Sequence, residues 1–351
     1  MAEPRAPKQD TTFQPKCHPE PRQFRCPFPP GRVGVTQPRP VPCTVLVHLN
    51  GKLVPHDQAA ISPFDHGFLF GDGVYEGLRA FSHNGQTRII GQDRHTRRFN
   101  LGLAACGINW DTAQMAALTR QLLDANNLAD AFVYWQVTRG TPDLSAGPTR
   151  SRVPKHINSA AAPLPPTVFG YCSPMPALNL TGGVPALKRA SLEPDLRWHQ
   201  GHIKSISLLG NVIAAINGAR NHQADEALFI RTLRTASGTE QHLLTEGSYT
   251  NAVVVLGTGD SARWLTPSDA SVSILAGVTR DLLLDLEPRL VKADITRDEV
   301  LSASEVLLVG TTTMVTTVTH LDGRQVAQTP GPVARHLHTV LCRAIAEHRD
   351  H

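Results

Sequence analysis

Two Asn-Gly pairs constrain the first half of this chain more than any other local feature. They lie at residues 50–51 and 84–85, inside the stretches "TVLVHLNGKLVP" and "GVYEGLRAFSHNGQTRII". Asn-Gly between apolar runs favours a tight antiparallel hairpin, because both residues accept positive φ. Helical spacing is found in "DRHTRRFNLGLAACGI" and "TAQMAALTRQLLDANN", and strands are predicted at "AFVYWQVTRG" and "PTVFGYC". The sequence therefore predicts an α+β fold.

The order of these segments divides the chain into four parts. Residues 1–43 are rich in Pro, Arg and Gln and are predicted to be a disordered extension or the product of a misassigned start site. Residues 44–172 form a smaller N-terminal domain, and the turn-rich residues 173–183 form a linker. Residues 184–351 form a C-terminal domain, with strands at "EALFI", "NAVVVLG", "RWLTP" and "EVLLVG" and helices over 207–221, 279–287 and 333–348.

Composition excludes several classes of function. The chain has 351 residues, of which 41% are hydrophobic and 18% charged, with a net charge of +4. It has no basic stripe with interleaved aromatic residues, so no nucleic-acid partner is expected. It has no apolar run long enough to span a bilayer and no secretory signal, so we expect a cytoplasmic protein. Its six cysteines form no CxxC pair, so neither a metal site nor a disulfide framework is expected.

Four segments of the second half could carry chemistry. Lys204 lies in the apolar stretch "HIKSISLLGNV", where a partly neutral amine could form a Schiff base with an aldehyde. Glu246 lies at a turn between two strands. Val278 and Thr279 open a helix after Gly277, and Gly310, Thr311 and Thr312 follow a strand; both segments could bind an anion through backbone N–H groups. Taken singly, each has an ordinary structural explanation, such as a solvated lysine, a capped turn or a threonine-rich strand.

The first half adds three candidates. Tyr75 and Arg79 share one face of the predicted strand "FGDGVYEGLRAF" with Gly73 and Gly77, because side chains alternate along a strand. These glycines do not match G-x-G-x-x-G, and a strand follows them, so a dinucleotide site is rejected. Arg98, in "DRHTRRFNLG", could bind a phosphate through its planar guanidinium.

Together and in this order, the motifs YEGLRAF, HxxRFN, IKS, TEG, AGVTR and GTTT resemble those of the class IV aminotransferases, the fold type IV enzymes that use pyridoxal 5'-phosphate (PLP). The resemblance covers about residues 45 to 348. It implies a small N-terminal α/β domain, a larger β-barrel-like α/β domain, and an active site between them. It also implies at least a homodimer, whose active sites lie near the subunit interface.

The resemblance assigns a role to each candidate residue. Lys204 would form the Schiff base with PLP and move the proton between substrate and cofactor. Glu246 would pair with the ring nitrogen, because PLP needs an acidic partner there to act as an electron sink. The residues implied to bind the phosphate are Arg98, Val278, Thr279 and Thr311. The residues implied to bind the substrate are Tyr75, Arg79, Gly310, Thr311 and Thr312.

The motifs indicate the subgroup within this family less directly than the family itself. "VYEGLRAF" is close to the branched-chain pattern, whereas "VYWQVTRGT" and Leu209, which follows the lysine, are closer to the D-amino-acid enzymes. Those enzymes continue after RGT with Ser-Pro-Arg-x-His, which binds the substrate carboxylate. Here the chain continues as "PDLSAGPTRSR", so that Arg150 or Arg152 would need a rebuilt loop. We therefore expect ping-pong transamination of L-leucine, L-isoleucine and L-valine with 2-oxoglutarate. D-amino-acid transamination and aminodeoxychorismate lysis are the alternatives.

Overall fold

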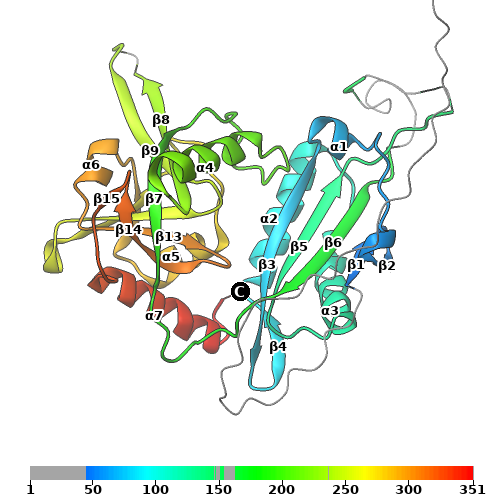
Figure 1. Ribbon diagram of the computed structural model, residues 1–351, viewed down its shortest axis with the longest axis horizontal. Helices are drawn as coiled ribbons and strands as arrows, with labels where there is room; N and C mark the ends of the chain where they lie inside the picture. Colours follow the sequence, from blue (N-terminus) through cyan, green and yellow to red (C-terminus); the bar gives the residue numbers. More distant parts are fainter. Residues whose placement is uncertain (1–44, 146, 148–150, 154–162, 236, 351) are drawn as a thin grey trace, which may run out of the picture. The chain divides into compact units, whose positions relative to one another are not determined.

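A computed structural model describes residues 45–145, 147, 151–153, 163–235 and 237–350. The predicted extension, residues 1–43, lies outside these ranges. Figure 1 shows the two β-sheets around which the described residues fold. The first sheet is antiparallel, with strand order β2-β1-β6-β5-β3-β4. Its strands are β1 (Leu46–Leu49), β2 (Lys52–Pro55), β3 (Gly73–His83), β4 (Gln86–Ile89), β5 (Ala131–Thr138) and β6 (Thr167–Pro174).

Both Asn-Gly pairs form the predicted hairpins, and the first residue of each has positive φ, 49° at Asn50 and 50° at Asn84. The helices that accompany this sheet are α1 (His66–Phe70), α2 (Gln92–Cys106) and α3 (Met115–Ala125). Helices α2 and α3 cover one face of the sheet and build a core around the fully buried Trp135. Gly107 ends α2 in the left-handed conformation, as its position predicts. Helix α1 was not predicted.

The second sheet is mixed, with order β12-β11-β10-β13-β14-β7-β8-β9 and β15 added beside β14. It curls, so that β9 at one edge also contacts β10. Its strands are β7 (Ala186–Pro194), β8 (Glu226–Arg234), β9 (Glu240–Gly247), β10 (Asn251–Leu256), β11 (Arg263–Pro267), β12 (Leu290–Ala293), β13 (Glu305–Gly310), β14 (Met314–Leu321) and β15 (Arg324–Gln325).

Three of the four helices of this second part were predicted. They are α4 (Leu209–His222), α5 (Val278–Leu286) and α7 (Pro332–Ala346), which match the predicted helices over 207–221, 279–287 and 333–348. The fourth, α6 (Arg297–Leu301), was not predicted, and neither were the strands β7, β12 and β15. Helices α5 and α7 pack on β10, β13 and β14 in one apolar core, which Phe81 and Ile90 also enter. The structure thus contains both helices and β-sheets, as predicted, and the fold is α+β.

The chain passes from the first sheet to the second between Pro174 and Ala186. This passage overlaps the predicted linker, while the division into two domains stays a prediction. Within the described ranges, no helix combines the length and apolar character that crossing a membrane requires. The same ranges hold no group of three His, Cys, Asp or Glu side chains that could bind a metal ion.

Candidate active site

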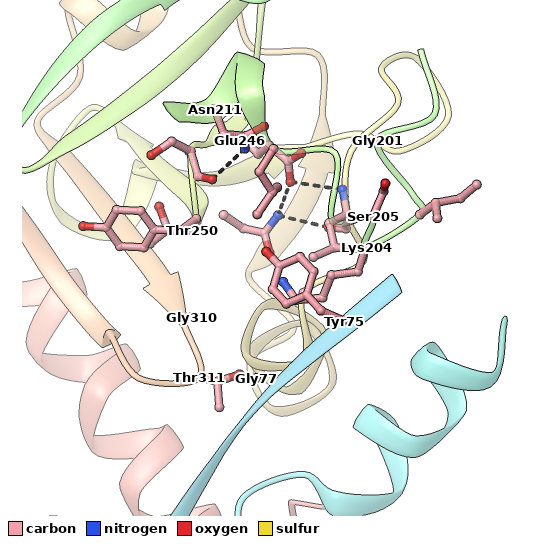
Figure 2. A pocket seen from close by; sticks show the side chains of 18 of the residues that line it. Tyr75, Gly77, Gly201, Lys204, Ser205, Asn211, Glu246, Thr250, Gly310 and Thr311 are labelled. Carbon is pink, nitrogen blue, oxygen red and sulfur yellow. Dashed lines mark hydrogen bonds between the residues drawn. The ribbon is translucent and has the colours of Figure 1, made fainter. Parts of the chain in front are cut away.

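A cavity of about 640 Å³ contains nearly all of the residues that the sequence singled out. Its walls come from β3 and β5 of the first sheet, from Arg98 on α2, and from strand ends, loops and helix starts of the second part. Figure 2 shows Tyr75 of β3 beside Lys204 in this cavity. The predicted site residues that line it are Tyr75, Arg98, Lys204, Glu246, Val278, Thr279, Gly310, Thr311 and Thr312. Residues far apart in the sequence thus meet in one place, which favours a common function.

The position of Lys204 is set by main-chain hydrogen bonds to β3. The Tyr75 N–H donates to the Lys204 carbonyl at 2.9 Å, and the Ile206 N–H donates to the Gly73 carbonyl at 3.1 Å. A Cβ on Gly73 would lie 2.8 Å from the Val137 carbonyl oxygen on β5 and 3.0 Å from Ile206 Cδ1, so glycine lets β3 pack closely against both β5 and the segment after Lys204. The Lys204 Nζ lies 4.4 Å from the centroid of the Tyr75 ring. The amine therefore faces an aromatic wall at the edge of the first sheet.

Glu246 lies near the end of β9 as a buried carboxylate with a partner on each oxygen. Its Oε1 accepts from Arg197 Nη1 at 2.9 Å, and its Oε2 accepts from the Leu275 N–H at 3.0 Å and from Asn251 Nδ2 at 3.3 Å. Burial raises the pKa of the Glu246 carboxyl, and the charge of Arg197 acts against this rise. The orientation of Glu246 is thus fixed, and its buried charge is partly balanced by Arg197. Pairing with a cation in the cavity requires both.

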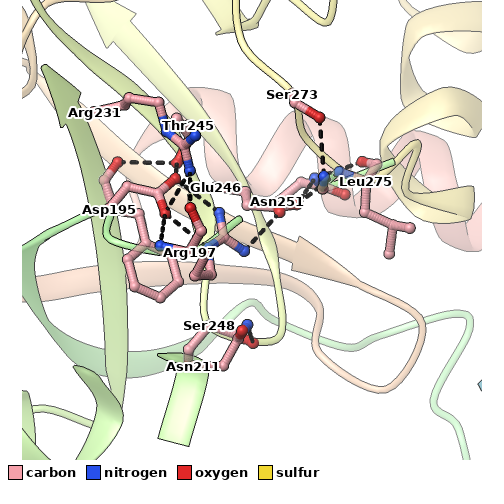
Figure 3. A network of polar contacts seen from close by, with 12 residues as sticks. Asp195, Arg197, Asn211, Arg231, Thr245, Glu246, Ser248, Asn251, Ser273 and Leu275 are labelled. Carbon is pink, nitrogen blue, oxygen red and sulfur yellow. Dashed lines mark hydrogen bonds and ion pairs between the residues drawn. The ribbon is translucent and has the colours of Figure 1, made fainter. Parts of the chain in front are cut away.

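Arg197 is itself held by a buried carboxylate, Asp195 (Figure 3). Asp195 accepts from Arg197 Nε at 2.9 Å, from Arg231 Nη2 at 2.8 Å and from Thr245 Oγ1 at 2.9 Å. Burial alone would raise the pKa of Asp195, but Arg197 and Arg231 lower it to about 2. None of Asp195, Arg197 and Arg231 was predicted as a site residue from the sequence. Asp195 follows strand β7, which was not predicted, and its pairing with Arg231 of β8 depends on that strand.

The start of α5 faces the cavity with its first N–H groups. Gly277 is the N-cap and provides no side-chain acceptor for them, so the positive end of the helix stays open to an anion. A Cβ on Gly277 would clash with Asn251 Oδ1. Glycine is therefore needed here, because Asn251 must reach across it to donate to Glu246 and to the Leu275 carbonyl.

A buried triad of Glu76, His95 and Arg98 forms the neighbouring wall. Arg98 donates to both oxygens of Glu76, at 2.7 and 3.0 Å, and His95 Nδ1 lies 2.6 Å from Glu76 Oε2. Arg98 also donates to the Ala276 carbonyl, one residue before Gly277, at 2.8 Å. Burial opposes ionisation of Glu76, yet Arg98 and His95 lower its pKa to about 2. Sequence reasoning found Arg98 and missed the other two, although Glu76 precedes Gly77 in the quoted motif.

Two more of the predicted residues lie on the turn after β13. Thr311 Oγ1 is 3.3 Å from His95 Nε2, so the triad reaches the turn. Arg79 donates to the Thr312 carbonyl at 3.2 Å and to the Pro176 carbonyl at 3.1 Å. The structure thus places Arg79 behind the turn that carries Gly310 to Thr312, and does not bring it to the cavity wall.

The donor set of the cavity fits PLP. The cofactor presents an aldehyde, a basic ring nitrogen and a phosphate, and the cavity offers an amine at Lys204, a buried carboxylate at Glu246 and an open helix start after Gly277. Arg98 donates to the Ala276 carbonyl just before that helix, and Thr311 lines the same cavity, so both could be further phosphate ligands by their chemistry. The assignment of these residues to the cofactor stays a prediction.

Comparison with known proteins agrees with this interpretation. Residues 73–321 match the family model described as amino-transferase class IV. A D-alanine aminotransferase from Bacillus licheniformis is 31% identical over 308 residues, covering 85% of this chain and 96% of that protein. A putative branched-chain-amino-acid aminotransferase from Methanocaldococcus jannaschii is 29% identical over 283 residues, covering 79% and 88%.

Solved structures show the same fold. The branched-chain aminotransferase from Thermoproteus uzoniensis with norvaline has a TM-score of 0.68 and 22% identity, covering 87% of this chain and 95% of that one. The branched-chain amino acid aminotransferase from Thermobaculum terrenum in its PLP form has a TM-score of 0.66 and 21% identity, covering 88% and 95%. The chain therefore belongs to the class IV aminotransferases, a family of PLP-dependent enzymes.

Proposed function

We propose that this chain transaminates L-branched-chain amino acids, with 2-oxoglutarate as the amino acceptor in a ping-pong reaction. The observation that carries the proposal is the aromatic face of the first sheet beside Lys204. Tyr75 and Tyr134 stack with ring centroids 5.5 Å apart, and Tyr134 and Tyr171 follow at 5.2 Å. Tyr75 and Phe132 line the cavity.

The ring of Phe132 packs over the main chain of Gly77 and extends this apolar face. Gly77 lies between Tyr75 and Arg79 on β3, and a Cβ there would lie 2.9 Å from the ring of Phe132. Transfer of a leucine-sized side chain from water to such a surface contributes about 1.5–3 kcal/mol. An apolar amino acid therefore suits this wall better than a charged one.

The polar residues divide the remaining tasks by their chemistry. PLP supplies an electron sink when it is bound. In this proposal, Lys204 holds the cofactor and moves a proton at the substrate Cα, and Glu246 keeps the proton on the ring nitrogen. The open start of α5 binds the phosphate together with Arg98 and Thr311. The N–H groups of Gly310 to Thr312 bind the substrate carboxylate.

The second candidate is a D-amino-acid aminotransferase, which the 31% identity to D-alanine aminotransferase favours. Such an enzyme needs a cationic ligand for the substrate carboxylate on the loop after Gly140. Arg152 of this loop lies 5.3 Å from the ring of Phe70 and is not among the residues that line the cavity. Arg150 lies outside the described residues. The position of Arg152 supports the L-specific proposal.

The experiment that separates these functions follows the absorbance of the PLP-loaded protein when one amino donor is added without an acceptor. We expect L-leucine to convert the aldehyde form of the cofactor to its amine form, and D-alanine to leave it unchanged. Conversion by D-alanine alone would refute the L-specific proposal and establish the second candidate. No conversion by either would refute both transaminase candidates and favour the lyase. The Lys204→Ala variant is the control, because it should respond to neither.

We further propose that the protein is at least a homodimer. Helix α4 exposes apolar side chains at successive turns, Leu209, Val212, Ile213 and Ile216, with exposures of 71, 49, 50 and 42%. This i, i+3, i+4, i+7 spacing forms one stripe, which a soluble helix normally buries. Light scattering should give at least twice the mass of one chain, and Ile213→Glu should lower it. Leu301→Glu, at a similarly exposed leucine on α6, should leave the mass unchanged.

A further inference from the structure

A buried carboxylate after α7 contacts the start of α2. Asp350 is 1% exposed, and its Oδ2 accepts from the Gly91 N–H at 3.0 Å. Gly91 is the N-cap of α2 and has no side chain with which to cap the helix. The carboxylate of a residue distant in sequence therefore lies at the positive end of α2, where a negative charge is favourable.

Arg88 on β4 ties the same two segments a second time. Its Nη1 donates to the Ile345 carbonyl, in the last turn of α7, at 3.1 Å, and its Nη2 lies 3.5 Å from Asp350 Oδ1. The guanidinium carbon lies 5.3 Å from the centroid of the Phe81 ring. Arg88 is thus oriented by an aromatic face and joins the end of α7 to the strand that leads into α2.

The anchored residue packs directly against the cofactor end of the cavity. Gly91 has a φ of +58°, and a Cβ there would lie 2.6 Å from Val278 Cγ1. Val278 begins α5, and α2 carries Arg98 about two turns beyond Gly91. Asp350, Gly91 and Val278 therefore form one line of contacts, from the end of α7 to the starts of α2 and α5.

We propose that Asp350 is a positioning residue, which sets the start of α2 against the start of α5 and so places Arg98 at the phosphate end of the cofactor site. The proposal rests on the cofactor site proposed above. Asp350 touches neither cofactor nor substrate and acts through Gly91. Its loss should weaken the binding of the phosphate and leave the contacts of the ring and the aldehyde in place.

The test compares PLP with pyridoxal, which has the same ring and aldehyde without the phosphate. Apoprotein of the wild type, Asp350→Ala, Asp350→Asn and Glu347→Gln is titrated with each compound, and the dissociation constants are measured. Glu347 is the matched control, because it lies three residues before Asp350, loses the same charge and pairs at the surface with Arg349. Thermal unfolding of each apoprotein is recorded in parallel.

We expect Asp350→Ala to raise the dissociation constant of PLP about tenfold, which is the scale of leaving a buried N–H without an acceptor. The dissociation constant of pyridoxal should change by less than about twofold, because pyridoxal lacks the phosphate that the start of α5 and Arg98 would bind. Asp350→Asn retains an oxygen for Gly91 and should fall between the wild type and the alanine variant. Glu347→Gln should match the wild type for both compounds.

Two results would overturn the proposal. One is an unchanged dissociation constant for PLP in Asp350→Ala, whatever its melting temperature, which would make Asp350 a stabilising residue only. The other is an equal loss for PLP and pyridoxal, which would mean that the whole site is disturbed. Failure of the wild type to bind PLP would instead refute the cofactor site, and so the two failures are distinguishable.

Discussion

Replacement of Glu76 by Gln tests whether the buried triad is held together by charge. Glu76 is fully buried and pairs with Arg98 and His95. Folding lowers the pKa of Glu76 from 4.5 to about 2, which corresponds to about 3 kcal/mol of stability at pH 7. Gln has nearly the same shape but leaves the charge of Arg98 without a counterion. We therefore expect Glu76→Gln to lower the free energy of unfolding by about 3 kcal/mol at pH 7.

The destabilisation caused by Glu76→Gln should depend on pH. A carboxyl whose pKa is lowered by folding contributes fully above pH 4.5, and the contribution is lost as the pH falls through 4.5 towards 2. The difference between wild type and Glu76→Gln should thus decrease to about 2 kcal/mol at about pH 3.5. Reversible urea unfolding at both pH values measures it. Glu240→Gln, which breaks the exposed pair with Arg234, should cost at most about 1 kcal/mol. A loss in Glu76→Gln no larger than in this control, or one independent of pH, would refute the reasoning.

Three further changes test the cavity. Lys204→Ala should keep the far-ultraviolet circular dichroism of the wild type but lose the visible absorbance that PLP gains on attachment to the amine; a retained band would refute the role of Lys204. Gly277→Ala places a methyl group against Asn251 Oδ1, so overpacking should destabilise the protein by about 1–3 kcal/mol, and an unchanged thermal unfolding curve would contradict this. Arg197→Met removes the charge that counteracts the raised pKa of Glu246, so the acidic limb of kcat/KM should move to higher pH, and an unmoved limb would count against the pairing.

Local patterns predicted the parts of the fold that local physics determines. Asn50 and Asn84 form the predicted turns, and Gly107 ends α2, because each adopts a backbone angle that few other residues accept. Strand β7 was missed because it lies between β14 and β8, where its pairing is set by partners far along the chain. Its sequence, "ALKRASLEP", has charges near its start and no continuous apolar run.

The candidate site likewise contains residues that local sequence patterns can predict and residues that only tertiary contacts reveal. The order of the motifs predicted the roles of Lys204 and Glu246, and the structure brings both residues to one cavity. His95 could have been found from Arg98, because the two residues are three apart on one helix and share a face. Glu76 could have been found as the acidic residue of the quoted strand motif. Asp195 could not, since its role depends on Arg231, and only the pairing of β7 with β8 brings the two side chains together.

The hydrogen bonds between residues 73–75 and 204–206 also bear on protein engineering. Grafting a wall of a binding site changes specificity alone only when the reactive group lies on a separate element. Here the strand that carries the aromatic wall is bonded through its main chain to the segment that carries the lysine. An exchange of β3 between relatives would therefore shift the Lys204 amine together with the aromatic wall. Successful chimaeras should transfer residues 71–75 and 204–207 as one unit.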